Sequence, residues 1–95
     1  MTAYLVVDCE VTDPQRFETY KAMVPGLVRQ FGGKYLARGG DVVPLEGDWK
    51  PQRIVIVEFP TLDAARTFLE SSEYRVARAA REGAARMRIL AVAGV

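Results

Sequence analysis

The sequence has 95 residues, 49% of them hydrophobic, and 13 basic and 12 acidic side chains give a net charge of +1. This length suits one domain, residues 1–95, and the near-neutral charge lacks the basic excess typical of nucleic-acid-binding proteins. The absence of histidine excludes Ser-His-Asp and Cys-His nucleophile systems, histidine-ligated haem and nearly all catalytic zinc sites. No ligand pattern indicates a metal ion, and no cofactor is expected.

Cys9 is the only cysteine, so no intramolecular disulfide can form, and a reducing compartment is favoured. It lies in an apolar run with no cationic neighbour in sequence, which favours a small buried hydrophobic residue over a reactive thiol. No signal peptide and no stretch of membrane-spanning length is present. We therefore expect a soluble cytoplasmic protein without a membrane partner.

The first two predicted elements are a strand over residues 3–11 and a helix that begins at Asp13-Pro14. Pro25 interrupts the helical pattern and is expected to kink or split the helix near Val24. Gly32-Gly33 supplies its end. Apolar residues recur at helical spacing at Phe17, Tyr20, Val24, Leu27, Val28 and Phe31.

Residues 34–38 and 53–59 are predicted strands, joined by residues 39–52. This connection is longer than the roughly two to five residues of a tight hairpin. Its glycines and prolines require it to turn more than once. Val42 and Val43 are expected to pair briefly within it.

The C-terminal part predicts a helix capped by Thr61, a further helical piece capped by Ser72 that ends at Gly83, and a strand over residues 87–92. The expected apolar faces comprise Leu62, Ala65, Phe68 and Leu69 in the first helix, and Tyr74, Ala77 and Ala80 in the second.

The resulting β-α-β-β-α-β order predicts an α+β, ferredoxin-like fold, with a four-stranded antiparallel sheet and two helices on one face. Right-handed crossovers lead us to expect strands 3–11 and 53–59 side by side and parallel in its centre. One face of these two strands is wholly apolar and should lie against the helices. It consists of Leu5, Val7 and Cys9, and of Val55, Val57 and Phe59.

The opposite face of the predicted sheet also carries many large apolar groups, too many to leave in water on a small monomer. We therefore expect a homodimer in which two sheets pack face to face. The groups concerned are Tyr4, Val6, Leu36, Ile54, Ile56 and Leu90.

Four segments together resemble the DUF1330 family of the dimeric α/β-barrel superfamily: AYLVVDCEVTDPQRFETY, VPGLVRQFGGKYLARGG, LEGDWKPQRIVIVEFP and SSEYRVARAAREGAARMRI. GGKYLARGG and EGDWKPQR are the most specific parts. The resemblance implies a ferredoxin-like protomer and a dimer whose sheets form a barrel, but no activity, because the family is uncharacterised. The wider superfamily includes cofactor-independent quinol-type monooxygenases, muconolactone-isomerase-like proteins, stress-response proteins and haem enzymes, the last with a histidine ligand that this chain lacks.

Asp8, Glu58 and Arg38 form the first candidate constellation, and all three are expected on the outer sheet face near one end. Two carboxylates beside an arginine can bind a polar substrate, and crowding can raise one pKa enough for a general base. An ion-pair network that orients the dimer is the favoured alternative.

Tyr35, Trp49, Lys50 and Arg53 form the second constellation. Trp49 lies in the long connection and can close over a ligand, with Tyr35 as a hydrogen-bonding wall and Arg53 as an anion anchor. The favoured alternative is that Trp49 anchors the loop on a partner subunit.

The third group is an arginine series, and its first three members fall near one helical face: Arg75, Arg78, Arg81, Arg86 and Arg88. A solvated face is favoured over an anion site, because Glu73 and Glu82 flank the series.

Two functional hypotheses follow. The first is a homodimer that binds a small molecule in a pocket between sheet and helices, open near residues 39–52, and that can be a cofactor-independent enzyme of monooxygenase or isomerase type. Its substrate would be a small aromatic or carbonyl compound, with Arg38 binding an anionic or carbonyl oxygen. The alternative is a non-catalytic, structural or stress-related interaction protein whose dimer is the functional object.

Overall fold

Four strands and three helices follow one another along the chain in the order that the sequence predicts. The computed structural model describes residues 1–95. Its elements are β1 (Ala3–Val11), α1 (Pro14–Gln30), β2 (Lys34–Arg38), β3 (Arg53–Phe59), α2 (Leu62–Glu70), α3 (Ser72–Ala80) and β4 (Ala85–Ala93). The predicted ferredoxin-like α+β arrangement is confirmed, and the second helical region is divided into α2 and α3. β4 is longer at both ends than residues 87–92, because β1 pairs along its whole length.

The sheet has the strand order β2-β3-β1-β4, and every neighbouring pair is antiparallel. The expectation that the two central strands run parallel is therefore wrong. The right-handed crossover through α1 relates β1 to β2, and these two strands do run in the same direction. β3 returns antiparallel to β2 and lies between the two, so it is antiparallel to both.

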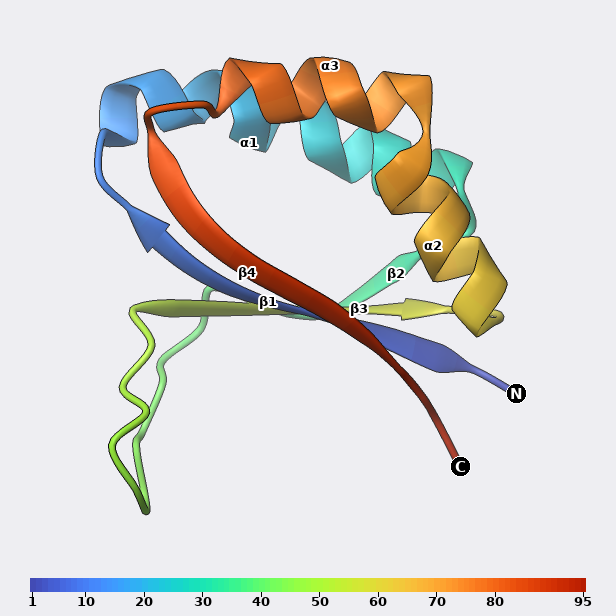
Figure 1. Ribbon diagram of the computed structural model, residues 1–95, viewed down its shortest axis with the longest axis horizontal. Helices are drawn as coiled ribbons and strands as arrows, with labels where there is room; N and C mark the ends of the chain where they lie inside the picture. Colours follow the sequence, from blue (N-terminus) through green and yellow to red (C-terminus); the bar gives the residue numbers. More distant parts are fainter.

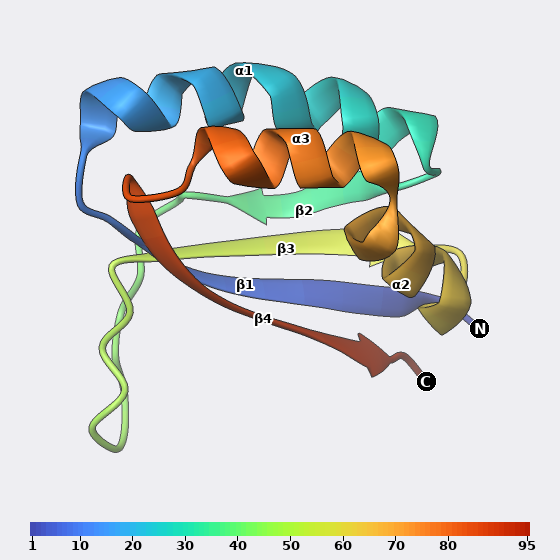
Figure 2. The ribbon, with the colours of Figure 1, turned by 45° about the horizontal axis from the view of Figure 1, so that its top comes forward.

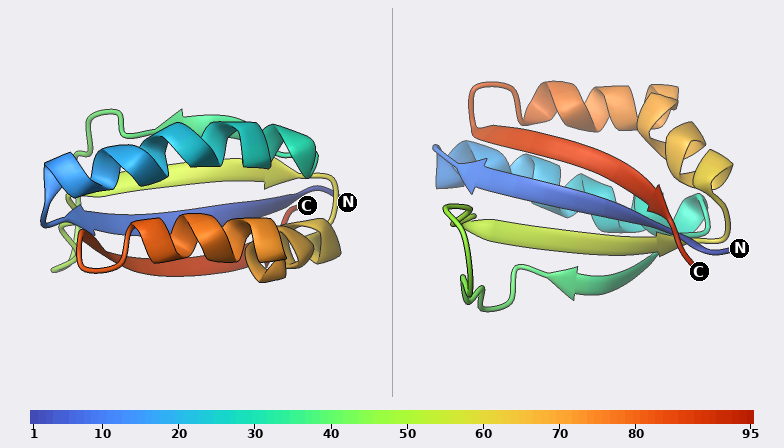
Figure 3. Two further views of the ribbon diagram at one scale, coloured as in Figure 1. Left: turned by 90° about the horizontal axis from the view of Figure 1, so that it is seen from above. Right: turned by 60° about the horizontal axis from the view of Figure 1, so that its bottom comes forward.

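All three helices cover one face of this sheet, and no helix covers the other (Figure 1). The segment 39–52, which we call the arm, extends from the uncovered side (Figure 2). α1 and α3 lie side by side and run roughly along the direction of the strands, and the underside of the sheet is open to view (Figure 3). None of the helices combines the length and apolar character needed to cross a membrane.

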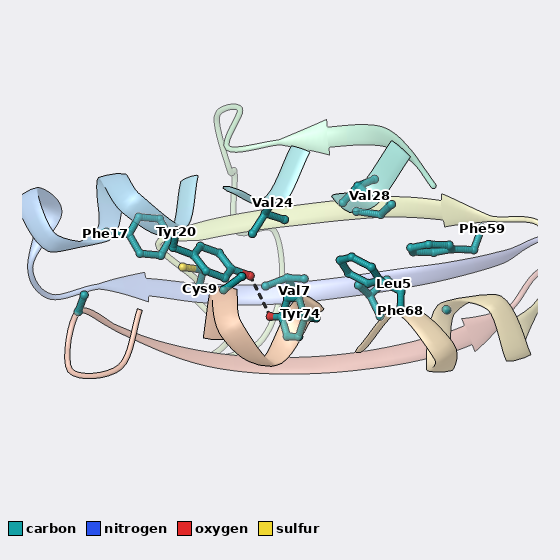
Figure 4. Packing of buried hydrophobic residues seen from close by; sticks show 14 residues of the cluster. Leu5, Val7, Cys9, Phe17, Tyr20, Val24, Val28, Phe59, Phe68 and Tyr74 are labelled. Atoms are coloured by element: carbon teal, nitrogen blue, oxygen red, sulfur yellow. Dashed lines mark hydrogen bonds between the residues drawn. The ribbon is translucent and has the colours of Figure 1, made fainter. Parts of the chain in front are cut away.

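The hydrophobic core lies between the helices and the inner face of the sheet (Figure 4). The predicted inner face is confirmed, with Val55 partly buried and the other five residues buried. Phe68 of α2 stacks at 5.4 Å from the Phe59 ring and 5.1 Å from the Tyr74 ring, so one aromatic row joins sheet, α2 and α3. Burying one such ring contributes roughly 1.5–3 kcal/mol.

α1 begins as expected, because Asp13 accepts a 3.2 Å hydrogen bond from the amide of Arg16 and Pro14 occupies the first turn. The helix then continues through Pro25 as one element, so the expected split near Val24 is wrong. Val24 and Val28 are both buried on the same core. Their packing holds both parts of the helix in place despite the amide that proline lacks.

Two local expectations need correction. The hydroxyl of Ser71, one residue before Ser72, caps α3 by accepting a 3.0 Å hydrogen bond from the Tyr74 amide. Val42 and Val43 form no strand pairing within the arm, which is irregular over residues 40–52. The Thr61 cap of α2 is confirmed by a 3.0 Å bond from the Ala64 amide.

Candidate functional site

The sheet register separates the two carboxylates of the first constellation. Asp8 lies opposite Ile54, whereas Glu58 lies opposite Tyr4, four positions further along β1. At about 3.4 Å per residue, this separates their backbones by roughly 14 Å along the strand direction. The prediction that Asp8 and Glu58 share one end of the sheet is wrong, because an antiparallel partner presents its residues in reverse order.

Arg38 lies on the inner side of the sheet, which contradicts its predicted place on the outer face. A register irregularity between Tyr35 and Ala37 shifts the pairing, so that Arg38 lies opposite the inward-facing Val55. Its guanidinium carbon stands 4.8 Å from the centroid of the Tyr35 ring, a cation–π contact. The structure thus combines Arg38 with Tyr35 rather than with Asp8 and Glu58.

Asp8 has two donors on one carboxylate oxygen. Its Oδ2 accepts a 3.0 Å bond from Trp49 Nε1 and a 2.7 Å bond from Arg88 Nη2. These bonds, the one from Trp49 first, lower the pKa of Asp8 below its usual range. Asp8 therefore stays ionised at neutral pH, and the expectation of a carboxylate with a raised pKa does not apply to it.

Trp49 and Lys50 belong to the outer side of the sheet, where they line a recess with Asp8 and Arg88. Trp49 remains half-exposed there. It does not line the inner space where Tyr35 and Arg53 lie, so the structure does not bring the second constellation together. Its role as an anchor on a partner subunit remains a prediction.

A cavity of about 60 Å³ lies between the sheet and the helices, and 15 of its 19 lining residues are hydrophobic. A single water needs about 15 Å³, so the space suits a small molecular fragment. Its charged lining residues are Lys21, Arg38 and Arg53, with no carboxylate among them. No carboxylate lies within 4.0 Å of Arg38 or Arg53, whereas Lys21 pairs with Glu18 at 3.5 Å.

Arg53 begins β3 opposite Cys9 and packs against the backbone of Gly39, at the start of the arm. Gly39 has φ of +73°, and a β-carbon there would overlap the guanidinium. Tyr35 is half-buried beside these cations; burial raises the pKa of its phenol, and Arg38 opposes this shift. Tyr35 is therefore a neutral hydrogen-bond donor at neutral pH.

Two further phenols line the cavity. The hydroxyls of Tyr20 and Tyr74 lie 2.9 Å apart and are buried, as the dashed line in Figure 4 marks. Helical spacing placed both residues on apolar helix faces, but the contact between them was not predicted. A tyrosine on an otherwise apolar helix face could have indicated this pair, because a buried tyrosine hydroxyl needs a hydrogen-bond partner.

Arg81 departs from the predicted solvated face. Its guanidinium carbon stands 5.5 Å from the centroid of the Tyr20 ring, and its Nε is buried without a hydrogen-bond partner. Arg81 therefore reaches the core side, although it also lines a surface recess with Arg75 and Arg78 where α3 ends.

Cys9 also lines the cavity and is 1% exposed, which confirms a buried hydrophobic residue. Burial raises the pKa of its thiol, so the thiolate is disfavoured. No group of three or more acidic or cysteine side chains is placed to hold a metal ion.

Solved structures with the same fold include a protein of unknown function from Rhodopseudomonas palustris, with TM-score 0.77 and 18% identity over 99% of this chain and 82% of that one. SnoaB, a cofactor-independent oxygenase from Streptomyces nogalater, has TM-score 0.69 and 16% identity over 99% and 93%. A Nitrosomonas europaea protein provisionally named as an antibiotic biosynthesis monooxygenase has TM-score 0.62 and 18% identity over 100% and 99%. At these identities the likeness shows the fold.

A comparison with curated proteins finds no match. A family model described as a domain of unknown function, DUF1330, matches residues 2–95. This match spans all seven helices and strands, and it agrees with the segments on which the resemblance was based. The chain therefore belongs to the DUF1330 family.

Proposed function

We propose that the chain binds a small, largely apolar molecule with an anionic or carbonyl oxygen in the cavity between sheet and helices. The observation that carries this proposal is the pairing of apolar walls with two arginines that have no carboxylate partner, Arg38 and Arg53. The residues that line this space come from all four strands and all three helices, so the cavity is part of the fold itself.

Physical chemistry supports an anionic ligand. The apolar walls contribute roughly 25 cal/mol for each Å² of ligand surface removed from water. A guanidinium at the edge of a low-dielectric space attracts negative charge more strongly than it would in water. Since no internal carboxylate competes for Arg38 and Arg53, a ligand carboxylate, phenolate or enolate can take that place.

We further propose a cofactor-independent activity of oxygenase or isomerase type. The shared fold with SnoaB, itself a cofactor-independent oxygenase, supports this choice. In such a reaction Arg38 and Arg53 would stabilise negative charge that develops on a substrate oxygen. The neutral phenol of Tyr35 would donate a hydrogen bond to the same oxygen.

The first experiment is native mass spectrometry of freshly purified protein, followed by titration with benzoate and with benzyl alcohol, monitored by protein NMR. Benzoate should bind more tightly than the alcohol, and Arg38→Gln should reduce this preference, since only Arg53 then remains to bind the carboxylate. Arg75→Gln, on the exposed side of α3, is the matched control and should keep it. Absence of benzoate binding, with no co-purified ligand, would overturn the binding proposal. Oxygen uptake with any co-purified ligand then tests the activity.

The uncovered sheet face supports a homodimer, which we propose as the assembly. Leu36, Leu90 and Val92 are each about half-exposed, and Val43 and Leu45 on the arm are more exposed still. Two copies packed face to face would bury these groups together, and each arm could then pack against the partner subunit. Sedimentation equilibrium should give a dimer, and Leu90→Glu should shift it toward monomer; a monomeric wild type would refute this assembly.

The dimer also defines the second candidate function, a non-catalytic interaction protein. The exposed apolar face favours it independently of the cavity. A stable dimer whose cavity binds neither benzoate nor a co-purified molecule would support this alternative.

A further inference from the structure

The buried tyrosine pair contains more hydrogen-bond donors than it uses. Tyr20 and Tyr74 each carry one O–H, and their 2.9 Å contact uses only one of the two hydrogens. No acceptor takes the second hydroxyl hydrogen, because the only other polar neighbour, Arg81 beside Tyr20, can donate but not accept. Tyr20 is 9% exposed and Tyr74 only 1%. One hydroxyl hydrogen is therefore left over inside an apolar cavity that both residues line.

Arg81 indicates which hydrogen is left over. Its guanidinium lies against Tyr20, and its attraction opposes the burial that raises the pKa of that phenol. A cation near the Tyr20 oxygen favours an orientation in which that oxygen turns its lone pairs toward the cation. The O–H of Tyr20 then points to Tyr74, and the O–H of Tyr74 remains free.

The same cluster lacks acceptors. Arg81 Nε nearby is also a buried donor without a partner, although Arg81 does not line the cavity, and no carboxylate lines it. Leaving the spare tyrosine O–H unsatisfied is unfavourable by roughly 1–3 kcal/mol, and a ligand oxygen in the cavity would relieve this. A hydrocarbon of the same shape could not supply this acceptor.

We infer that the Tyr20–Tyr74 pair is a hydrogen-bond donor site for a ligand oxygen, so that the cavity selects a carbonyl or phenolic compound over a hydrocarbon of equal shape. This inference rests on the proposed function, since it concerns the same cavity. It adds a second recognition element, from α1 and α3, to the arginines of β2 and β3. The ligand class becomes an anion at the arginine end with an acceptor oxygen at the tyrosine end.

The test uses two isosteric probes, 4-formylbenzoate and 4-vinylbenzoate, which differ by an oxygen in place of a CH₂ group. Dissociation constants are measured by NMR titration for the wild type, for Tyr74→Phe and for the double variant Tyr20→Phe/Tyr74→Phe. Tyr4→Phe, on β1 outside the cavity lining, is the matched control. Thermal unfolding of each variant checks that it is folded.

The wild type and Tyr4→Phe should bind the formyl compound about 2- to 10-fold more tightly, the ratio that one neutral hydrogen bond supports. The double variant should lose this preference; if it does not fold, a reduced preference in Tyr74→Phe is the required result. Equal binding of both probes by the wild type, as expected if only water occupies the tyrosine end, would overturn the inference and leave the proposed function standing. An unchanged preference in the variants would overturn it as well. If neither probe binds, both proposals fail.

Discussion

Trp49 donates a 3.0 Å hydrogen bond from its indole to Asp8, 41 positions away in the chain, and so ties the arm to the middle of the sheet. A second contact supports the arm base, where the side chain of Gln52 accepts a 2.8 Å bond from the Val11 amide. These two bonds fix the part of the arm next to β3 to β1, while the rest of this irregular segment extends away from the sheet (Figure 2).

Trp49→Phe should release the arm without unfolding the domain, because it removes the donor to Asp8 and keeps an aromatic ring. A hydrogen bond to a charged group contributes about 1.5–3 kcal/mol, and the half-exposed position of Trp49 suggests the lower end. Hydrogen exchange should rise at the Val11 amide, which donates to Gln52 of the arm, and stay constant in β3. Lys50→Gln, the neighbouring change, should leave the Val11 amide protected. Unaltered exchange in Trp49→Phe would show that the indole bond does not hold the arm.

Acid should weaken the contribution of Asp8 to stability. Because folding lowers the pKa of Asp8, its ionised form stabilises the native state. This stabilisation is complete above the unfolded-state pKa of about 3.9 and is lost as pH falls through the lower folded-state value. The difference in unfolding free energy between wild type and Asp8→Asn should therefore be constant above about pH 5 and shrink below about pH 4. A difference that stays constant down to pH 2 would contradict this assignment.

Arg38→Ala should weaken benzoate binding about 10- to 100-fold, the loss expected for one charge-assisted hydrogen bond. The dimer should persist, because Arg38 lies on the inner side of the sheet and lines the cavity. Titration and sedimentation of the same sample separate the two effects. Dissociation of the dimer with unchanged binding would instead assign Arg38 to the interface.

Gly39→Ala should displace the side chain of Arg53, which lies against Gly39 although it is distant in the sequence. A β-carbon at Gly39 would overlap the Arg53 guanidinium, and the φ of +73° adds backbone strain. We expect weaker benzoate binding, by about 10-fold, as the guanidinium is displaced from the cavity edge. Gly40→Ala is the matched control, because a β-carbon there meets nothing within 4 Å. Equal affinities in the two variants would show that Arg53 takes no part in binding.

Gly33→Ala should destabilise the domain by about 1–3 kcal/mol, the usual effect of overpacking a core. A β-carbon at Gly33 would lie 2.8 Å from Val28 and 2.9 Å from the Phe59 ring. Gly26→Ala, inside α1 with no neighbour within 4 Å, should instead stabilise by about 0.5–1 kcal/mol. Urea denaturation of both variants measures these two changes in the free energy of unfolding, which should have opposite signs. An unchanged free energy of unfolding in Gly33→Ala would show that the core relaxes around the added methyl group.

Local patterns in the sequence were enough to predict the fold. β2 and β3 have the predicted bounds, and the caps at Asp13 and Thr61 form as expected. Period-two alternation separated the inner from the outer residues of β1, because side chains of a strand alternate between faces. Pro25 shows the limit of such signals, since core packing on Val24 and Val28 overrides the local preference for a break.

The candidate site could be predicted only in part. Tyr35 and Arg53 do line the cavity, but the grouping of Asp8 with Glu58 and Arg38 was wrong. A strand pattern says which residues share a face of one strand, but not how its neighbour is aligned along it.

The sequence by itself determined the order of elements, the apolar face of each and the family, because these depend on local spacing and residue type. Only the tertiary structure decided which side chains meet. The antiparallel register separates Asp8 from Glu58, a single irregularity in β2 turns Arg38 inward, and the packing of α1 on α3 brings Tyr20 to Tyr74. Each of these depends on the alignment of elements that are distant in the chain, which local spacing and residue type do not specify.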